Sequence, residues 1–531
     1  MTDIVAPIFV QPVDAVLPQI VVAVKQGADI IELRCDQANR EIIESLLTCP
    51  DLQSKQIIVT IRAKAEGGLF SGSEADRLNL ILHACRLKPR YVDIEYDTWR
   101  KNPEFVAQAV PLLAKDPAEN SGRPKLILST HDFSSRPPDL QQRLTAMAET
   151  SPACIIKAAY HAENLVEALE AFRLYEELPK VVRQPLVIIA MGEAGLITRI
   201  LAAKYNAAFT FAVPPGNATT APGQPTITDL IHTYHFKSQT RNSPVYGVMG
   251  WPVSHSISPM IHNAGFHAVG FPGVYVPLPI EPEYERFRAT VSALRGLRDL
   301  NFRGASVTIP HKAHAARYLE NSGGMLDDTA ARIGVINTLY FPSDGSVGGT
   351  NSDWYGAIEA MRAATGWKLT DLAFKRVAVL GAGGAARAMV AGMASLGATV
   401  VVYNRTLKRA QELAYEFNGK IGQVSAALLD EFSKTNCNVV INCTPAGMSP
   451  HVKTTPVDDM SVINSTMVAF DTVYNPRRTR FLDIATKQGA QTIEGLEMLV
   501  RQAVVQFEGF TGESAPLGVM RVAAEAALEH G

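Results

Sequence analysis

Two residues in the first half of the chain have the types needed to activate a ketone. Lys157 ends the apolar run CIIK, and His131 ends the run LILSTH earlier in the chain. A buried lysine close to other cations can lose its proton, and the neutral amine then attacks a ketone. A histidine beside the resulting iminium can remove a proton from the neighbouring carbon, with Glu66 to orient or tune it. A single lysine at a strand end is more often part of a structural ion pair, and a single histidine is more often a core residue. The prediction of Schiff-base chemistry therefore rests on the two residues together.

The elements that would carry these residues are short apolar runs, with helix-like segments such as Glu74–Arg86 and Glu163–Tyr175 between most of them. Alternating strands and helices imply parallel strands, and eight strands fit a (β/α)8 barrel. An open doubly wound sheet is the alternative, but the polar residues gather where the runs end, as they do in barrel enzymes. The runs are Ile8–Val10, Ile30–Leu33, Ile57–Ile61, Tyr91–Ile94, Leu126–Leu128, Cys154–Ile156, Leu186–Ile189 and Ala208–Ala212, and the other polar residues are Glu32, Arg34, Arg62, Asp93, Glu95 and Arg199.

The second half contains a strand, a Gly-rich turn and a helix in succession. The run Arg376–Leu380 is followed at once by GAGGAAR, a variant of the G-x-G-x-x-A dinucleotide motif. Gly381 permits the tight turn, Gly383 lets the backbone approach a pyrophosphate, and Ala386 permits close packing of helix on strand. The turn residues predicted to bind a dinucleotide are Gly381, Ala382, Gly383, Gly384 and Ala385.

The next strand of this half indicates which dinucleotide binds. It ends in Asn404, Arg405 and Thr406, where an acidic residue would bind the ribose 2′-hydroxyl of NAD. Arg405 can instead pair with a 2′-phosphate through charge-assisted hydrogen bonds. We therefore predict that the cofactor is NADP(H).

A second group of candidate residues lies between residues 245 and 355. Ser256 and Ser258 stand on a turn suited to a carboxylate, and Lys312, Asn337 and Asp353 follow in separate motifs. A Lys–Asp pair can deliver a proton to a carbonyl oxygen while hydride arrives at the carbon, because the carboxylate holds the ammonium in place. This role requires that the residues meet in one cleft.

Composition and charge limit the class of protein. The chain has 531 residues, 47% of them hydrophobic, and a formal net charge of −2, which favours a globular enzyme without a nucleic-acid or membrane partner. The six cysteines form no C-x-x-C pair, and neither a signal peptide nor an apolar membrane segment is visible. We expect a cytoplasmic protein with reduced thiols and no metal site.

The chain divides near residue 240, in the polar stretch KSQTRNSP. We expect a barrel over residues 1–235, a substrate-binding lobe over 244–355, an NADP-binding Rossmann lobe over 356–510 and a C-terminal helix over 511–531 that returns to the substrate lobe. The predicted fold class is therefore α/β, a TIM barrel followed by a two-lobe dehydrogenase.

Motifs of the first half resemble type I 3-dehydroquinate dehydratases over about residues 5–232. They are ELR at 32–34, TIRAKAEGG at 60–68, STHDF at 129–133, IIKAAY at 155–160, MGEAGLITRI at 191–200 and APGQPT at 221–226. The resemblance implies a Schiff base at Lys157, a general acid/base at His131 and an assisting Glu66. It further implies that Arg199 holds the substrate carboxylate, with Gln224, Thr220, Glu32, Arg34 and Arg62 around the substrate. Thr220 stands where that family has a serine, in a loop that differs in length.

Motifs of the second half resemble shikimate dehydrogenases over about residues 244–525. They include SHSISP, VTIPHK, INT, NSD, GAGGAAR, NRT, INCTPAGM, DTVYNP and GLEMLVRQA in the order of that family. The resemblance implies that Lys312 and Asp353 are the catalytic pair. The substrate would contact Ser256, Ser258, Thr308, Asn337, Tyr474 and Gln502, and the nicotinamide side of the cofactor site would include Asn442, Thr444, Met448 and Gly495.

Together the two resemblances imply one chain that dehydrates 3-dehydroquinate and then reduces 3-dehydroshikimate to shikimate, as plant-type fusions do. Three alternatives stay open: a quinate-oxidising fusion, a ligand-sensing regulator without catalysis, and a Schiff-base aldolase fused to another reductase. Ser256 and Arg405 argue against the first, the intact Lys157, His131 and Lys312 against the second, and the APGQ string against the third. The expected partners are these small molecules alone, and a monomer is compatible with the fusion.

Overall fold

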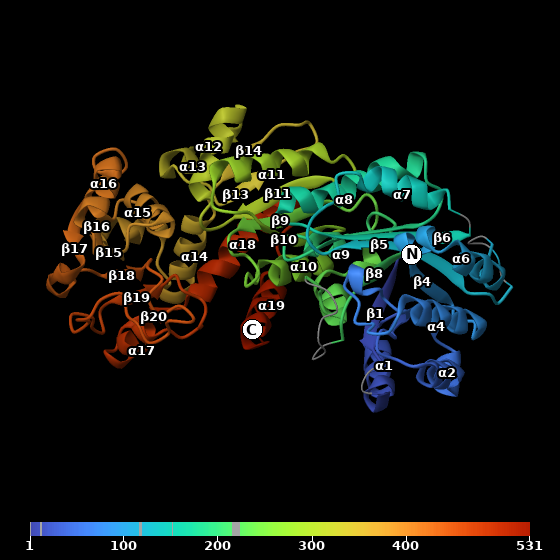
Figure 1. Ribbon diagram of the computed structural model, residues 1–531. Coiled ribbons are helices and arrows are strands. Elements are labelled where there is room, and N and C mark those ends of the chain that lie inside the picture. Colours follow the sequence, from blue (N-terminus) through green and yellow to red (C-terminus); the bar gives the residue numbers. More distant parts are fainter. Residues whose placement is uncertain are drawn as a thin grey trace. The chain divides into compact units, whose positions relative to one another are not determined.

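The computed structural model describes residues 2–10, 13–115, 119, 121–150, 152–214 and 223–530. Internal contacts divide the chain into two compact units. Unit 1 comprises Met1–Val245, Pro272–Glu281 and Ala289–Phe302, and unit 2 comprises Tyr246–Phe271, Pro282–Arg288 and Arg303–Gly531. Figure 1 labels the elements of both units.

Eight parallel strands form the sheet of unit 1, in the order β7-β6-β5-β4-β3-β2-β1-β8. A backbone hydrogen bond of 2.9 Å from Ala208, just before β8, to Leu186 on β7 joins the two end strands. The predicted (β/α)8 barrel is therefore confirmed. The strands are β1 (Asp3–Phe9), β2 (Ile30–Arg34), β3 (Gln56–Thr60), β4 (Tyr91–Glu95), β5 (Lys125–Asp132), β6 (Ala153–His161), β7 (Leu186–Met191) and β8 (Phe209–Phe211).

Strand boundaries differ most from the sequence-based expectation at β1, β5 and β6. β1 begins five residues before the expected Ile8, because its first residues pair with β8 although Ala6 and Pro7 interrupt the apolar run. β5 and β6 extend beyond their apolar runs to Asp132 and His161, because the two strands keep pairing with each other. His131 and Lys157 therefore lie within strands rather than at their ends.

Helices cover the outside of this barrel. Helix α4 shows how the sequence sets their ends: the Ser73 hydroxyl accepts a hydrogen bond from the Asp76 amide, and the Asp76 carboxylate accepts one from the Ser73 amide, each 3.2 Å long. The main helices are α1 (Val16–Lys25), α2 (Arg40–Thr48), α3 (Pro50–Gln53), α4 (Glu74–Arg86), α5 (Tyr96–Lys101), α6 (Pro103–Ala109), α7 (Leu140–Ala148), α8 (Leu165–Glu177) and α9 (Leu196–Ile200).

The inward faces of the strands follow one rule that positions the site. Successive side chains of a strand point to opposite faces, so residues two apart share a face. Ile155 and Ala159 both belong to the apolar cluster inside the barrel, which places Lys157 between them on the inward face of β6. The same spacing puts polar residues above inward apolar ones on three other strands: Glu32 above Ile30, Asp93 and Glu95 above Tyr91, and Ser129 and His131 above Ile127. Arg62 follows the end of β3, above Ile58.

Unit 2 contains two sheets. In the first, β9 (Val245–Gly250), β11 (Phe302–Val307), β13 (Thr338–Tyr340), β14 (Gly348–Thr350) and β12 (Met325–Leu326) lie in that order. Its helices are α10 (Ser258–Ala268), α12 (Lys312–Ser322) and α13 (Asp328–Ile333). The residues of β10 (Val274–Pro279) belong to unit 1, and α11 (Tyr284–Gly296) is divided between the two units.

The second sheet of unit 2 is parallel throughout, in the order β17-β16-β15-β18-β19-β20. Taken in chain order this is 3-2-1-4-5-6, the arrangement that binds dinucleotides where the strand order reverses, here between β15 and β18. Its strands are β15 (Arg376–Leu380), β16 (Thr399–Asn404), β17 (Val424–Leu428), β18 (Val439–Asn442), β19 (Val468–Asp471) and β20 (Gln491–Ile493). The helices α15 (Gly384–Ser395), α16 (Leu407–Phe417) and α17 (Arg480–Lys487) connect them (Figure 1).

Two long helices, α14 (Asp353–Thr365) and α18 (Gly495–Thr511), pack along each other, and α19 (Leu517–His530) packs on α10. Gly356 is the point of closest approach between α14 and α18. A Cβ atom at this position would lie 2.7 Å from the carbonyl oxygen of Met498 and 2.8 Å from the amide nitrogen of Gln502. The helices can meet this closely because residue 356 has no side chain.

We expect Gly356→Ala to lower the free energy of unfolding by about 1–3 kcal/mol, because a methyl group added to a packed interior forces the backbone apart. Denaturant unfolding followed by circular dichroism measures this change. Gly518→Ala is the matched control, since a Cβ atom there meets nothing within 4 Å and alanine favours the helix. Equal stability of the two variants would contradict the prediction.

Candidate functional site

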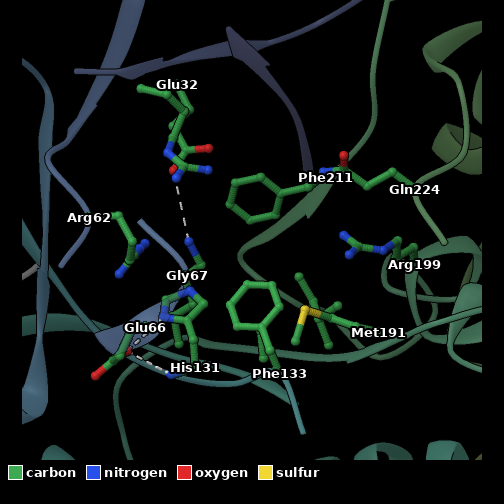
Figure 2. Close-up of a pocket in the computed structure, with 14 residues that line it drawn as sticks. Glu32, Arg62, Glu66, Gly67, His131, Phe133, Met191, Arg199, Phe211 and Gln224 are labelled. Atoms are coloured by element: carbon green, nitrogen blue, oxygen red, sulfur yellow. Dashed lines mark hydrogen bonds and ion pairs between the residues drawn. The ribbon is translucent and has the colours of Figure 1, made fainter. Parts of the chain in front are cut away.

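A cavity with about 470 Å³ of empty space, part of it open to solvent, occupies the mouth of the barrel in unit 1. Figure 2 shows Glu66 and His131 joined on one side and Arg199 and Gln224 on the other. Eight of the residues predicted for this site line the cavity: Glu32, Arg34, Arg62, Glu66, His131, Lys157, Arg199 and Gln224. Thr220 lies outside the described residues.

Lys157 is buried at 5% exposure, and its surroundings differ from the expected group of cations. Its ammonium donates a hydrogen bond of 2.9 Å to Oδ2 of Asp93, and Oε1 of Glu32 lies 4.0 Å away. The ring of Phe211 lies beneath it, 4.5 Å from Nζ to the centroid. A carboxylate therefore faces the amine directly, which the apolar run CIIK could not indicate.

Asp93 is at the centre of a buried group of charges. Its Oδ1 accepts a hydrogen bond of 2.6 Å from Ser129 and lies 3.0 Å from the guanidinium of Arg62. Burial alone would raise the pKa of Asp93, but Arg62 and Lys157 hold it well below its usual range. Arg62 also lies 3.2 Å from Glu95, and these two carboxylates outweigh burial and raise the pKa of Arg62. The charges of the site are thus balanced inside the barrel.

Glu66 and His131 form a hydrogen-bonded pair at the edge of the cavity. One oxygen of Glu66, Oε2, accepts the backbone N–H of His131 at 2.8 Å and lies 3.0 Å from its Nδ1. Burial raises the pKa of Glu66 to about 7. Burial together with the positive charges of Arg62 and Lys157 lowers the pKa of His131 well below its usual value. The imidazole is therefore neutral near pH 7, the form that can accept a proton.

Arg199 is a buried cation at 2% exposure that takes part in no ion pair between described residues. Its Nε has no hydrogen-bond partner in that part of the chain. Burial lowers its pKa to about 10, so the guanidinium remains charged at neutral pH. A buried, charged and unsatisfied guanidinium is costly unless an anion completes it. This residue therefore favours an anionic ligand in the cavity.

Several residues that shape this cavity were not among the predicted site residues. Asp36 holds Arg34 through hydrogen bonds of 2.7 and 3.3 Å and also accepts the amides of Arg62 and Leu69. The two-residue spacing of inward positions could have identified some of the others. They are Asp93, Ser129, Phe133, Met191 and Phe211.

In unit 2 the structure brings Lys312, Asn337, Asp353 and Gln502 together. Lys312, the first residue of α12, donates a hydrogen bond to Oδ2 of Asp353, the first residue of α14. Nδ2 of Asn337 lies 2.9 Å from the other oxygen of Asp353 and 3.1 Å from Oε1 of Gln502. Asp353 is therefore held at both oxygens, and its lysine partner is the more accessible of the two.

The other residues predicted for this substrate site lie at nearby element ends. The hydroxyl of Ser256 accepts the amide of Ser258 at 3.3 Å at the start of α10, and Thr308 follows β11, its amide bonded to Met249 on β9. Tyr474 follows β19 and is half-buried. No hydrogen bond between described residues joins the two serines, Thr308 or Tyr474 to the Lys312–Asp353 pair.

The Gly-rich turn connects β15 to α15, at the point where the strand order of the second sheet reverses. Gly381 has φ +111°, and a Cβ atom there would lie 3.1 Å from the side chain of Thr444 and 3.2 Å from the carbonyl of Cys443. A Cβ at Gly383 would meet nothing within 4 Å, and one at Gly384 would lie 3.7 Å from the Lys312 side chain. The turn is therefore an open cradle with the aliphatic part of the Lys312 side chain close by, which fits a dinucleotide.

Asn442, predicted on the nicotinamide side, is fully buried and bonded within the protein. Its Nδ2 donates to Asp471 at 2.9 Å, and its Oδ1 accepts the amide and the hydroxyl of Thr444 at 3.0 and 2.7 Å. Burial raises the pKa of Asp471 to about 6. The Asn442 side chain shapes the loop that carries Thr444 and the exposed Met448.

The two remaining groups of predicted cofactor residues differ in exposure. Asn404 bonds to the carbonyl of Thr406 at 2.9 Å, while Arg405 between them is exposed and joins none of the ion pairs among described residues. Gly495 is buried at the start of α18, where a Cβ would lie 2.3 Å from the carbonyl of Val473. Its glycine is required by that close backbone approach.

Among the described residues, no group of three or more His, Cys, Asp or Glu side chains is arranged to hold a metal ion. No described helix combines the length and the apolar character needed to cross a bilayer.

Comparison with known families assigns both halves of the sequence. Residues 4–241 match type I 3-dehydroquinase. Residues 248–339 match the shikimate dehydrogenase substrate binding domain, residues 364–488 match shikimate / quinate 5-dehydrogenase, and residues 495–525 match the shikimate 5′-dehydrogenase C-terminal domain.

Individual relatives agree with these matches. The chain is 36% identical to the chloroplastic bifunctional 3-dehydroquinate dehydratase/shikimate dehydrogenase of Arabidopsis thaliana, over 97% of this chain and 82% of that protein. It is 37% identical to the NADP(+) shikimate dehydrogenase of Methanothermobacter thermautotrophicus, over 54% of this chain and 98% of that protein. The crystal structure of a shikimate dehydrogenase in complex with NADP+ aligns with a TM-score of 0.50 and 32% identity, over 55% of this chain and 97% of the other.

Proposed function

The chain belongs to the family of bifunctional enzymes that join a type I 3-dehydroquinate dehydratase to a shikimate dehydrogenase, and we propose that Lys157 and Lys312 are the central residues of its two sites. It is a shikimate-pathway enzyme: the first half dehydrates 3-dehydroquinate to 3-dehydroshikimate, and the second reduces that product to shikimate with NADPH. The observation that supports the residue roles best is the cavity of unit 1, in which a buried lysine, a neutral histidine and an unsatisfied arginine face one space.

In the dehydratase site, Lys157 adds to the ring ketone and forms an iminium, which makes the neighbouring carbon acidic. His131 removes the proton from that carbon, and Glu66 holds Nδ1 so that Nε2 accepts it. The hydroxyl on the next carbon takes up a proton from the protonated His131 and leaves as water, and hydrolysis of the iminium then frees Lys157 and the product. Arg199 pairs with the carboxylate, and the remaining polar residues, Glu32, Arg34, Arg62, Gln224 and Thr220, orient the substrate hydroxyls.

In the dehydrogenase site, Lys312 gives a proton to the carbonyl oxygen while Asp353 holds its ammonium in place. Asn337, Gln502, Ser256, Ser258, Thr308 and Tyr474 hold the carboxylate and hydroxyls of the substrate. The Gly381–Ala385 turn, Asn404–Thr406 and the loop with Thr444 and Met448 hold NADPH, which supplies the hydride. The open cradle and the exposed Arg405 support this assignment.

We propose that the dehydratase barrel spans residues 1–235, the substrate lobe 244–355 and the NADP lobe 356–510, with the last helix returning to the substrate lobe. The contacts of α19 with α10 support the last part of this division. We also propose that the enzyme works as a monomer in the cytoplasm. Its six cysteines are all free, which is typical of a reducing compartment.

Incubation of the purified chain with 3-dehydroquinate and NADPH tests both sites in one assay of cofactor absorbance. We expect the unaltered chain to oxidise NADPH with this substrate. Lys157→Ala should do so only when 3-dehydroshikimate is supplied, and Lys312→Ala with neither substrate. Lys157→Ala leaves the dehydrogenase half unaltered, and Lys312→Ala leaves the dehydratase half unaltered, so the activity that each variant keeps is the control for its unaltered half. An unaltered chain that is inert with both substrates would refute the proposed function.

Replacing Glu66 tests the Glu66–His131 pair through the pH dependence of dehydration. The pKa of about 7 predicts that dehydration by the unaltered chain increases as the pH rises through 7, because an ionised Glu66 supports His131 as a base. Glu66→Gln keeps a hydrogen-bond acceptor but not the charge. It should lower kcat about 100-fold and remove the inflection near pH 7. A variant that keeps the original pH profile would exclude this role, and circular dichroism against the unaltered chain checks that the barrel is folded.

Replacing Arg405 tests the choice of cofactor. We expect Arg405→Ala to raise KM for NADPH about 10–100-fold, the effect of losing a charge-assisted hydrogen bond, and to leave KM for NADH unchanged. Arg376→Ala is the control, because Arg376 begins β15 and the Gly-rich turn follows the other end of that strand. Equal increases in KM for both cofactors would show that Arg405 does not contact the 2′-phosphate.

A further inference from the structure

Asp93 is placed to act on the reacting nitrogen of the dehydratase site, although no role has been assigned to it above. We propose that Asp93 is the counter-ion of the Schiff base at Lys157: its Oδ2 accepts the N–H of the iminium and keeps that nitrogen protonated while the neighbouring carbon loses its proton. This inference rests on the proposed dehydratase function.

The two oxygens of Asp93 have separate partners. Oδ2 accepts the hydrogen bond from Lys157, and Oδ1 accepts one from Ser129 and faces Arg62. Asp93 and Ser129 are fully buried, and both lie inward on neighbouring strands, β4 and β5. Oδ2 therefore stays directed at Lys157 when the lysine reacts, because Arg62 and Ser129 hold the other oxygen.

The chemistry requires an anion at this position. The ammonium of Lys157 first gives up one proton, and the neutral amine then adds to the ketone carbon. The ketone oxygen leaves as water with that proton and one more from the amine. The nitrogen of the iminium keeps one proton and a positive charge, and this charge draws electrons from the neighbouring C–H bond. An imine that lost this proton would no longer activate the carbon, so a buried carboxylate 2.9 Å away favours the reactive form.

The other carboxylates around Lys157 accept hydrogen bonds from other residues. Glu95 accepts from Arg62, Arg77 and the amide of Ala63. Glu32 lies 4.0 Å from Nζ and accepts the hydroxyl of Thr60, and Glu66 accepts from His131. The nearby cations, Arg34, Arg62 and Arg199, disfavour a positive charge on the nitrogen. Of the described carboxylates, Asp93 alone is within hydrogen-bond distance of Nζ.

The test is the pH dependence of reductive trapping. Cyanoborohydride reduces a protonated iminium, so incubation with 3-dehydroshikimate, the ketone product, labels Lys157 only while the nitrogen holds its proton. Intact-mass and peptide mass spectrometry measure the labelled fraction from pH 6 to 10. We expect labelling by Asp93→Asn to decline at a pH at least about one unit lower than labelling by the unaltered chain, since a lost anionic partner shifts a pKa by this amount or more.

Two variants separate charge from packing. Asp93→Glu restores the anion and should return the midpoint toward that of the unaltered chain. Ser129→Ala removes a hydrogen bond to Asp93 but leaves both charges and the contact with Arg62, so its midpoint should move less than that of Asp93→Asn. Circular dichroism and thermal unfolding of each variant, compared with the unaltered chain, report whether the barrel is folded.

Asp93→Asn fails to fold if the loss of one partner of a buried ion pair costs too much stability. For that outcome, a measurement on the unaltered chain tests the proposal. Its labelling should persist to a higher pH than labelling of a lysine peptide in water by the same ketone. Identical pH profiles for chain and peptide, or for the chain and Asp93→Asn, would overturn the proposal. Absence of labelling at Lys157 in the unaltered chain, with labelling of the peptide, would instead refute the Schiff-base function itself.

Discussion

A buried carboxylate shared by two cations holds the first site together. Asp93 lies between Arg62 and Lys157, and Glu95 joins Arg62 to Arg77 behind them. Each of these side chains would be costly to bury alone, since the effective cost of an unpaired buried ion is several kcal/mol. The paired charges therefore fix one another, and Lys157 has a defined position before any substrate binds. Arg199, without such a partner, leaves one positive charge for the ligand to neutralise.

This arrangement depends on the alternation of side chains along the barrel strands. At the closed end the inward positions are apolar, with residues such as Ile30, Ile58, Ile127 and Ile155 in one cluster. Two residues further along, the same faces carry charged or hydroxyl groups. Because every strand is parallel, these groups reach the same end of the barrel at similar heights. The apolar layer beneath excludes water, and this makes the ion pairs above it strong and the pKa shifts of Glu66 and His131 large.

The sequence predicted the fold class and most elements, because strand and helix periods are local properties. The ranges Glu74–Arg86 and Arg376–Leu380 agree with α4 and β15. Strand ends were predicted less well, because pairing with a neighbour extends β5 and β6 past their apolar runs. The partners of a charged residue depend on how its strand pairs with the neighbouring strands, and these strands are distant in the sequence. For this reason the sequence identified Lys157 and His131 but gave no indication that Asp93 faces the amine.

Both proposed sites pair a lysine with an aspartate, and the surroundings of the carboxylate differ between them in a way that fits the two chemistries we propose. Asp93 is shared with Arg62, a permanent cation deep in the barrel, so it remains an anion and suits a lysine that must carry charge as an iminium. The second oxygen of Asp353 meets the neutral amide of Asn337 instead. Lys312 lies at a helix start beside the open turn at Gly384 and is less buried than Lys157. A lysine of this kind can exchange protons with a substrate oxygen and with water, whereas the more enclosed Lys157 suits the covalent attack that we propose for it. The amino-acid pair alone thus specifies neither reaction, and the partner of the far carboxylate oxygen is the feature that separates them.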